Sequence, residues 1–277
     1  MHNLVIIVFL VLLFASLAGS TGIGGGGFFT PVLLIVGILT PHEAIPLSKA
    51  IILGVATGAV LLNIRNKKVM YKFAFLMEPF TIAGTLIGVQ LNMFLPGTIL
   101  LVLLVLVLSL TGLKTLYSAK EKRHHILNGD DCSQVPESSA ETQKSAATCE
   151  PKSFRQKCLG IVGALCAGIL AGSVGIGGGL LKVPLMLELG LAAEFAAGTG
   201  SLMVLFTSLS TVTQFVIFQR LGLLVALGFF MIGFLGSLIG SYCSRFLSEG
   251  YKLQIVLAGL ILLSTGMISM QWVFVAA

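Results

Sequence analysis

The sequence predicts an all-α membrane protein that crosses the bilayer several times. Three observations predict this fold class: a mean hydropathy of +1.02, a charged-residue content of only 10%, and a series of apolar segments separated by short polar turns. Soluble domains carry about 25% charged residues. Backbone in hydrocarbon must satisfy its own hydrogen bonds, and apolar segments do so as helices. We therefore expect a polytopic helical protein of a lipid bilayer, located in the plasma membrane.

The apolar segments fall into two groups on either side of one long hydrophilic stretch. They cover residues 4–18, 28–39, 44–64, 73–95 and 98–118, and then 158–171, 180–191, 195–218, 223–245 and 252–276. Residues 119–156 are rich in Ser, Lys and Glu, a composition that favours a flexible linker. We expect a first membrane repeat at 1–118, the linker at 119–156 and a second membrane repeat at 157–277.

A match at an offset of 153 residues indicates that the two groups are copies of one unit. Residues 17–26 and 170–179 are identical at nine of ten positions, and Pro31 then aligns with Pro184. Internal repeats are typical of transporter folds, which place the substrate site between the repeats. The match also makes the N-terminal apolar segment an expected part of the fold rather than a cleaved signal peptide.

The relative orientation of the copies depends on the first two apolar pieces of each repeat. Segments 4–18 and 28–39 are both shorter than the ~20 residues that a span requires. If the two pieces form a re-entrant pair, each repeat crosses the membrane three times and the second copy is inverted. If they form one Gly-broken span, each repeat crosses four times and the copies are parallel. Cytoplasmic loops are rich in Lys and Arg. Inversion places Arg245 and Lys252 inside and only Arg220 outside, so we favour inversion.

Each predicted half-helix, 28–39 or 180–191, follows a glycine run. The glycines that we expect to bind substrate are Gly22, Gly24, Gly25 and Gly26 in the first repeat, and Gly175, Gly177, Gly178 and Gly179 in the second. The first amides of a helix lack intrahelical partners and carry partial positive charge, which favours an anion. The alternative is that the glycines only permit close helix packing.

Three of the charged residues in the apolar segments are further candidates for the site. Lys49 and Lys182 lie near the glycine runs, where they would suit an anionic substrate, and ionisable groups inside membranes are functional candidates by default. The alternative for either lysine is that it extends to the membrane interface. Glu78 lies inside an apolar segment, where it would carry protons or pair with a lysine.

Ser48, Thr199 and Ser201 are candidate hydrogen-bond donors to a substrate, although hydroxyls in membrane helices also bond to backbone carbonyls. The four histidines lie in loops or near the chain start, and no nucleophile-base pair or metal-ligand motif falls in an apolar segment. We therefore expect no enzyme activity, no metal and no cofactor. The net charge of +6 is explained by membrane orientation rather than by nucleic acid.

The two GxGGG…P copies resemble the sulfite exporter TauE/SafE family of permeases (the toluene sulfonate uptake permease type). The stretch LSKAIILGVATGAVLLNIR…FLMEPFTIAGTLIGVQLNMFLP, within residues 47–96, is similar to the family's plant-type branch. The resemblance implies transport of sulfur-containing anions such as sulfite or organic sulfonates, often tied to an ion gradient. The family's GTS pattern reads Gly198-Thr199-Gly200-Ser201 here.

We therefore expect a secondary transporter for a small sulfur-containing anion, bound between the two glycine motifs, with H⁺ or Na⁺ as the co-transported ion. Alternating access would come from one repeat moving against the other. The alternative is a passive anion channel with the same site. Uphill accumulation driven by an ion gradient distinguishes the two. The sequence does not predict the oligomeric state, the direction of transport or the particular anion.

Overall fold

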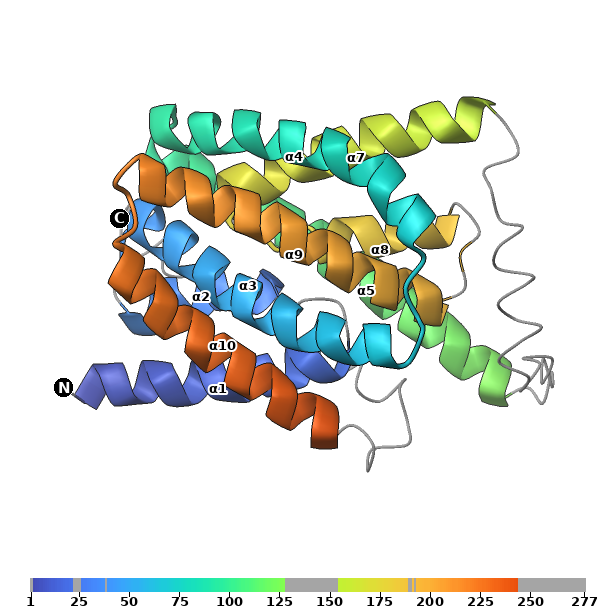
Figure 1. Ribbon diagram of the computed structural model, residues 1–277, viewed down its shortest axis with the longest axis horizontal. Coiled ribbons are helices and arrows are strands. Elements are labelled where there is room, and N and C mark those ends of the chain that lie inside the picture. The colour runs from blue at the N-terminus through green and yellow to red at the C-terminus, as the bar shows by residue number, and fades with distance from the viewer. Residues whose placement is uncertain are drawn as a thin grey trace.

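A computed structural model describes residues 2–21, 26–37, 39–127, 154–188, 191 and 193–243 of the chain. Within these ranges all regular structure is α-helical, which confirms the predicted fold class. The helices, shown in Figure 1, are α1 (His2–Thr21), α2 (Gly26–Gly37), α3 (Pro41–Arg65), α4 (Tyr71–Phe94), α5 (Gly97–Leu127), α7 (Phe154–Val174), α8 (Gly179–Glu188), α9 (Ala193–Ile217) and α10 (Leu223–Cys243).

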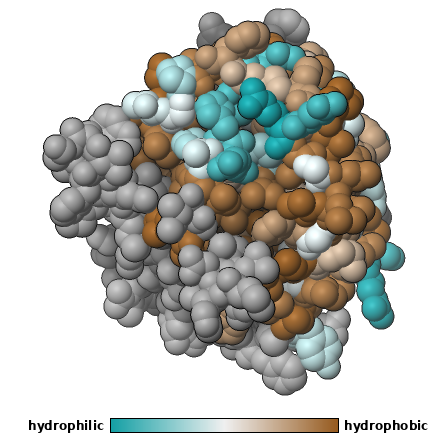
Figure 2. Space-filling view, turned by 90° about the vertical axis from the view of Figure 1, so that its left-hand side faces the viewer, coloured by the Kyte–Doolittle hydropathy of each residue, from teal (hydrophilic) through white to brown (hydrophobic). Residues whose placement is uncertain are grey.

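In the described part of the chain, four helices are long and apolar enough to cross a membrane. They are Pro41–Arg65, Tyr71–Phe94, Phe195–Ile217 and Leu223–Gly240. Large apolar side chains point outward from them, as with Leu224 at 85% exposure. Figure 2 shows hydrophobic residues over much of the visible surface, with hydrophilic residues gathered in one region. These features make the chain an integral, multi-pass membrane protein.

Glycines set how closely the helices pack. A Cβ at Gly84 or at Gly88 of α4 would overlap the backbone of α7, near Gly168 and Gly172 respectively. Small residues let membrane helices approach until their backbones touch, and this close approach replaces the hydrophobic driving force that lipid does not provide. The pairs α4 with α7, and α10 with α1 and α3, are accordingly in extensive contact.

The centre of the protein is an apolar cluster formed by α2, α3 and the segment between α7 and α8. Phe29, Leu33, Ile51, Ile52 and Ile176 are all at most 1% exposed. Ile176 belongs to the second glycine run, so the run lies inside protein rather than against lipid. Irregular backbone at membrane depth is tolerated only in such surroundings or along a cavity.

Helices that correspond in the predicted repeats run in opposite directions. Asn63, near the end of α3, bonds to Ser201 at the start of α9, whereas Ile45 at the start of α3 shares a cluster with Phe215 near the end of α9. The α3–α4 and α9–α10 turns accordingly lie at opposite ends of the molecule in Figure 1. Opposite directions are what an inverted repeat would give, and the repeat itself stays a prediction.

Helical structure extends into both ends of the predicted linker. Helix α5 continues to Leu127 and α7 begins at Phe154, whereas we expected a linker over 119–156. Residues 119–123 read Ala-Lys-Glu-Lys-Arg, all strong helix formers, so the helix continues beyond the apolar segment. Residues 128–153 lie outside the described residues.

Candidate functional site

The second glycine run separates α7 from α8 with a short non-helical segment. Helix α7 ends at Val174 and α8 begins at Gly179, and Gly175 adopts φ +80° between them. This left-handed conformation is accessible to glycine and costly for residues with a Cβ. The helix therefore breaks at the predicted position, and the carbonyls at the end of α7 need partners from elsewhere.

The two glycine runs meet in space. A Cβ on Gly26, the first residue of α2, would fall on the backbone of Gly177, and a Cβ on Gly177 would lie 3.1 Å from the Cα of Gly26. The start of one half-helix thus contacts the segment that leads into the other. Both residues are buried. The predicted Gly22, Gly24 and Gly25 lie outside the described residues.

Lys49 of α3 is completely buried beside this contact. Its ammonium donates a hydrogen bond to the carbonyl of Ile176 at 3.0 Å. Among the described residues it has no other hydrogen-bond partner and no carboxylate partner. An ammonium has three N–H donors, so two remain available. The alternative that Lys49 extends to the membrane interface is wrong, because the side chain is 0% exposed and directed at Ile176.

Hydroxyl groups from α2 and α3 surround Gly175 of the same break. Thr30 Oγ1 donates to Ser48 Oγ at 2.9 Å, and Ser48 Oγ donates to the carbonyl of Ile45 at 2.7 Å. Both hydroxyls also lie within 3.4 Å of the carbonyl oxygen of Gly175. The predicted residue Ser48 is therefore next to Lys49 and to the second glycine run, but it is already bonded to backbone.

Lys182 of α8 forms a buried ion pair with Glu78 of α4. Lys182 Nζ lies 3.2 Å from Glu78 Oε2, and the two side chains are 1% and 6% exposed. Thr207 of α9 donates to Glu78 Oε1 at 2.7 Å and accepts a hydrogen bond from Lys182. A third acceptor for Lys182 is the carbonyl of Met203 at 3.3 Å. Of the alternatives for Glu78, the structure shows the pairing with a lysine.

The remaining predicted residues divide between this centre and the α3–α4 turn. Gly178 lies beneath the Lys182 side chain, with its Cβ position 3.2 Å from Lys182 Cε, and Gly179 is the first residue of α8. In contrast, Thr199 Oγ1 accepts a hydrogen bond from the backbone N–H of Met70, and Ser201 bonds to Asn63. These two hydroxyls therefore bind protein groups at one end of α9, and their role in substrate binding stays a prediction.

Substituting Thr199 by valine distinguishes a structural role from a binding role. If the hydroxyl serves the α3–α4 turn, the variant is expected to lose about 0.5–1.5 kcal/mol of unfolding free energy, the usual value of one hydrogen bond, and to keep its affinity for substrate. Denaturation followed by circular dichroism would measure the stability, and a calorimetric titration with sulfite, an anion that the family resemblance implies, would measure the affinity. A weaker affinity at unchanged stability would instead assign Thr199 to the binding site.

Sequence reasoning missed the partners that hold these groups in place. Thr30, Thr207 and Asn92 were not predicted, yet Asn92 Nδ2 donates to the carbonyl of Ser173 at 2.7 Å and so satisfies the end of α7. Polar residues in α9 at helical spacing were a usable signal for Thr207. Thr30 aligns with Val183 in the other repeat, so the repeat gave no indication of it.

No group of three or more His, Cys, Asp or Glu residues suited to a metal ion occurs in the described part of the chain. The buried centre instead consists of two lysines, one glutamate, hydroxyls and the glycine break. These features define a multi-pass helical membrane protein with a buried cationic centre where two half-helices meet.

The sequence matches the profile of the Sulfite exporter TauE/SafE family over residues 7–268, so the chain belongs to that family. Over 84 residues it is 44% identical to Sulfite exporter TauE/SafE family protein 2 of Arabidopsis thaliana. This match covers 30% of this chain and 18% of that relative. Family protein 5 of the same plant is 25% identical over an alignment of 332 residues. This alignment covers 83% of this chain and 74% of the relative.

A bacterial relative also matches over most of its length. Probable membrane transporter protein YunE of Bacillus subtilis (strain 168) is 27% identical over 217 residues, which are 76% of each chain. With family protein 2 the match spans less than two thirds of the relative's length. No solved structure gives a significant match. The relatives are named as exporters or membrane transporters rather than as enzymes.

Proposed function

We propose that this protein is a secondary transporter of the plasma membrane for a small sulfur-containing oxyanion, such as sulfite or an organic sulfonate, and that the anion binds at Lys49. The observation that carries the proposal is the burial of the Lys49 ammonium beside the glycine break, with two donors that have no acceptor among the described residues. A buried charge is costly unless it is paired. An organic sulfonate carries one negative charge, which this lysine would offset.

The groups around Lys49 support recognition of an anion. Gly26 and Gly177 bring the start of α2 against the break, and the first amides of a helix favour negative charge. From the sequence we keep Gly22, Gly24, Gly25, Gly26, Gly175, Gly177, Gly178, Gly179 and Ser48 as proposed substrate-binding residues, of which Gly22, Gly24 and Gly25 lie outside the described residues. The names of the family and of its plant relatives, which mention sulfite, favour a sulfur oxyanion over other anions.

The Lys182–Glu78 pair supports coupling of transport to protons. While Glu78 is ionised it neutralises Lys182, so only Lys49 attracts an anion strongly. Protonation of Glu78 would cancel the carboxylate charge and release Lys182 as a second positive group. A cycle in which the anion and the proton bind together follows from this arrangement, and Glu78 is its coupling residue. Na⁺ is the other candidate ion.

The directions of the helices support alternating access. Helices α3 and α9 contact each other and run oppositely, and each belongs to a different predicted repeat. In transporters built from inverted repeats, one repeat rocks against the other around a central site. The contact of Gly26 with Gly177 lies between the two predicted repeats, where such a movement would expose it to each side in turn.

Substituting Lys49 by methionine tests the proposed site. We expect the initial rate of sulfite uptake into proteoliposomes to fall by at least tenfold, because the buried anion loses its counter-charge. The matched control is Lys72→Met, which removes an exposed lysine, and this variant should take up sulfite at the parent rate. Uptake by a folded Lys49→Met variant at the parent rate would contradict the site.

The same vesicles separate a transporter from a passive channel. With an inward proton gradient, a coupled transporter accumulates labelled sulfite above its external concentration, whereas a channel only equilibrates it. Collapse of the gradient with a protonophore should release the accumulated anion. Equilibration without accumulation, under both proton and sodium gradients, would favour the channel.

A further inference from the structure

Polar side chains continue along α9 beyond the ion pair. Thr207, Ser210, Thr211 and Gln214 are buried or half-buried and follow one another at intervals of three or four residues, which places them along one side of the helix. They lie within the candidate span Phe195–Ile217. A row of polar groups inside a membrane helix is costly unless it has a purpose in packing or function.

Contacts with α4 connect this row to Glu78. Thr207 Oγ1 donates to Glu78 Oε1 at 2.7 Å, Ser210 Oγ lies 3.5 Å from Thr85 Oγ1, and Gln214 Nε2 lies 3.3 Å from Ser210 Oγ. No side-chain hydrogen bond joins Thr207 to Ser210, and these two residues are separated by about one helical turn, or about 5 Å. One water molecule bridges such a distance.

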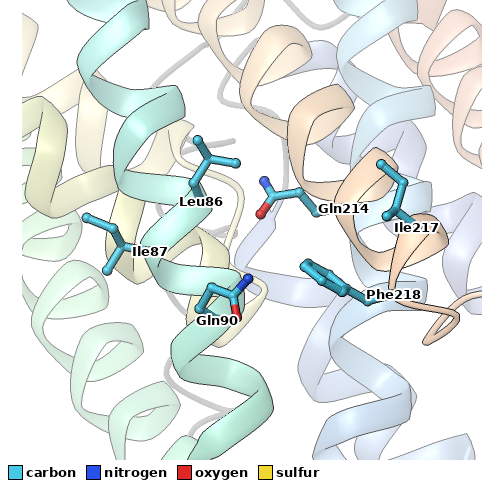
Figure 3. A pocket seen from close by; sticks show the side chains of 6 residues that line it. All are labelled: Leu86, Ile87, Gln90, Gln214, Ile217 and Phe218. Atoms are coloured by element: carbon cyan, nitrogen blue, oxygen red, sulfur yellow. The ribbon is translucent and has the colours of Figure 1, made fainter.

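The row ends at a groove on the surface. Leu86, Ile87, Gln90, Gln214, Ile217 and Phe218 line a hollow of about 320 Å³ between α4 and α9. Figure 3 shows the amides of Gln90 and Gln214 on opposite sides of this hollow. It lies where α4 and α9 end, next to exposed Gln219 and Arg220.

The corresponding interface of the other predicted repeat, between α3 and α10, carries among its described side chains only isolated hydroxyls, at Thr57 and Ser237, and each donates to a backbone carbonyl of α3. At the 153-residue offset, Thr207 corresponds to Gly54 and Thr211 to Gly58. A Cβ at Gly54 would overlap the backbone of Phe230, and Phe230 stacks on Phe234 with ring centroids 6.1 Å apart. This interface is closed by direct backbone contact, so polarity between α4 and α9 is not a general feature of the fold.

We infer that the α4–α9 interface is a hydrated access path by which protons reach Glu78 from the groove at Gln90 and Gln214. The inference rests on the proposed function, because only coupled transport requires Glu78 to exchange protons. A proton that crosses the polar row and the bridging water transfers to a Glu78 carboxylate oxygen. This transfer gives a neutral carboxylic acid and ends its ion pair with Lys182. The reverse transfer restores the pair, and no electron is exchanged.

Cysteine accessibility tests the path without reference to any substrate. In a background with the five native cysteines replaced, single cysteines at 214, 210 and 211 would be reacted with a charged methanethiosulfonate in lipid nanodiscs. Controls at the same depth on the lipid-facing side of α9 are Thr213→Cys and Leu209→Cys. A thiol reacts as the thiolate, which forms in water and not in hydrocarbon.

We expect Gln214→Cys and Ser210→Cys to react at least tenfold faster than Thr213→Cys and Leu209→Cys. Rates should fall from 214 to 210 to 211, because the reagent enters at the groove. Reaction rates at positions 214 and 210 equal to those at the control positions 213 and 209 would overturn the path. A cysteine at 214 that reacts, with cysteines at 210 and 211 that do not, would overturn it as well. The labelling reaction contains no substrate, so its result does not depend on which anion binds. Slow labelling would therefore contradict the access path alone, and normal uptake by the Lys49→Met variant would contradict the proposed anion site alone.

Discussion

Replacing Lys182 by methionine is expected to lower the free energy of unfolding by about 3–5 kcal/mol, the usual cost of breaking a buried ion pair from one side. The variant leaves Glu78 without the ammonium at 3.2 Å, in a place where the carboxylate is only 6% exposed. Thermal or denaturant unfolding in detergent, followed by circular dichroism, would measure the loss. Lys72→Met, which removes an exposed charge, should stay within about 0.5 kcal/mol of the parent.

A double substitution separates the pair interaction from the loss of the lysine itself. Glu78→Gln together with Lys182→Met removes both charges and keeps an amide near Thr207, so it should recover much of the stability that Lys182→Met loses. The double variant should lose gradient-driven uptake, because a glutamine side chain at position 78 cannot bind and release a proton. A double variant no more stable than Lys182→Met would show that the charge pairing contributes little.

Replacing Gly26 by alanine is expected to disrupt the contact between the two half-helices. Its Cβ would fall on the backbone of Gly177, and backbone cannot move aside as a flexible side chain does. Overpacking in a close-packed interior typically costs about 1–3 kcal/mol, and we expect the upper part of that range. Unfolding measurements would give the cost, and sulfite uptake should fall with the displaced half-helix.

Gly228 of α10 provides the matched control for this substitution. A Cβ there meets nothing within 4 Å, and alanine favours helix over glycine by about 0.5–1 kcal/mol. Gly228→Ala is therefore expected to be neutral or slightly stabilising and to keep its uptake. If Gly26→Ala were as stable and active as Gly228→Ala, the two glycine runs would not meet as described.

The local sequence predicted the helices and the break well. The break between α7 and α8 contains Gly175 at φ +80°, a conformation that glycine adopts readily, so the glycine run in the sequence indicates where the helix ends. The burial of Lys49 was less predictable. A lysine near the end of an apolar segment can extend to the interface, and only the position of α3 in the centre decides otherwise.

The sequence by itself determined that this protein is helical, embedded in a membrane and interrupted at the second glycine run, because hydropathy and glycine content act through local chain properties. Only the tertiary structure decided which lysine has a carboxylate partner. Lys182 meets Glu78 across 104 positions of sequence, and Lys49 meets Ile176 across 127. Contacts at such separations depend on how whole helices pack, and no local pattern encodes them. That packing leaves Lys49 as the buried cation without a carboxylate among the described residues.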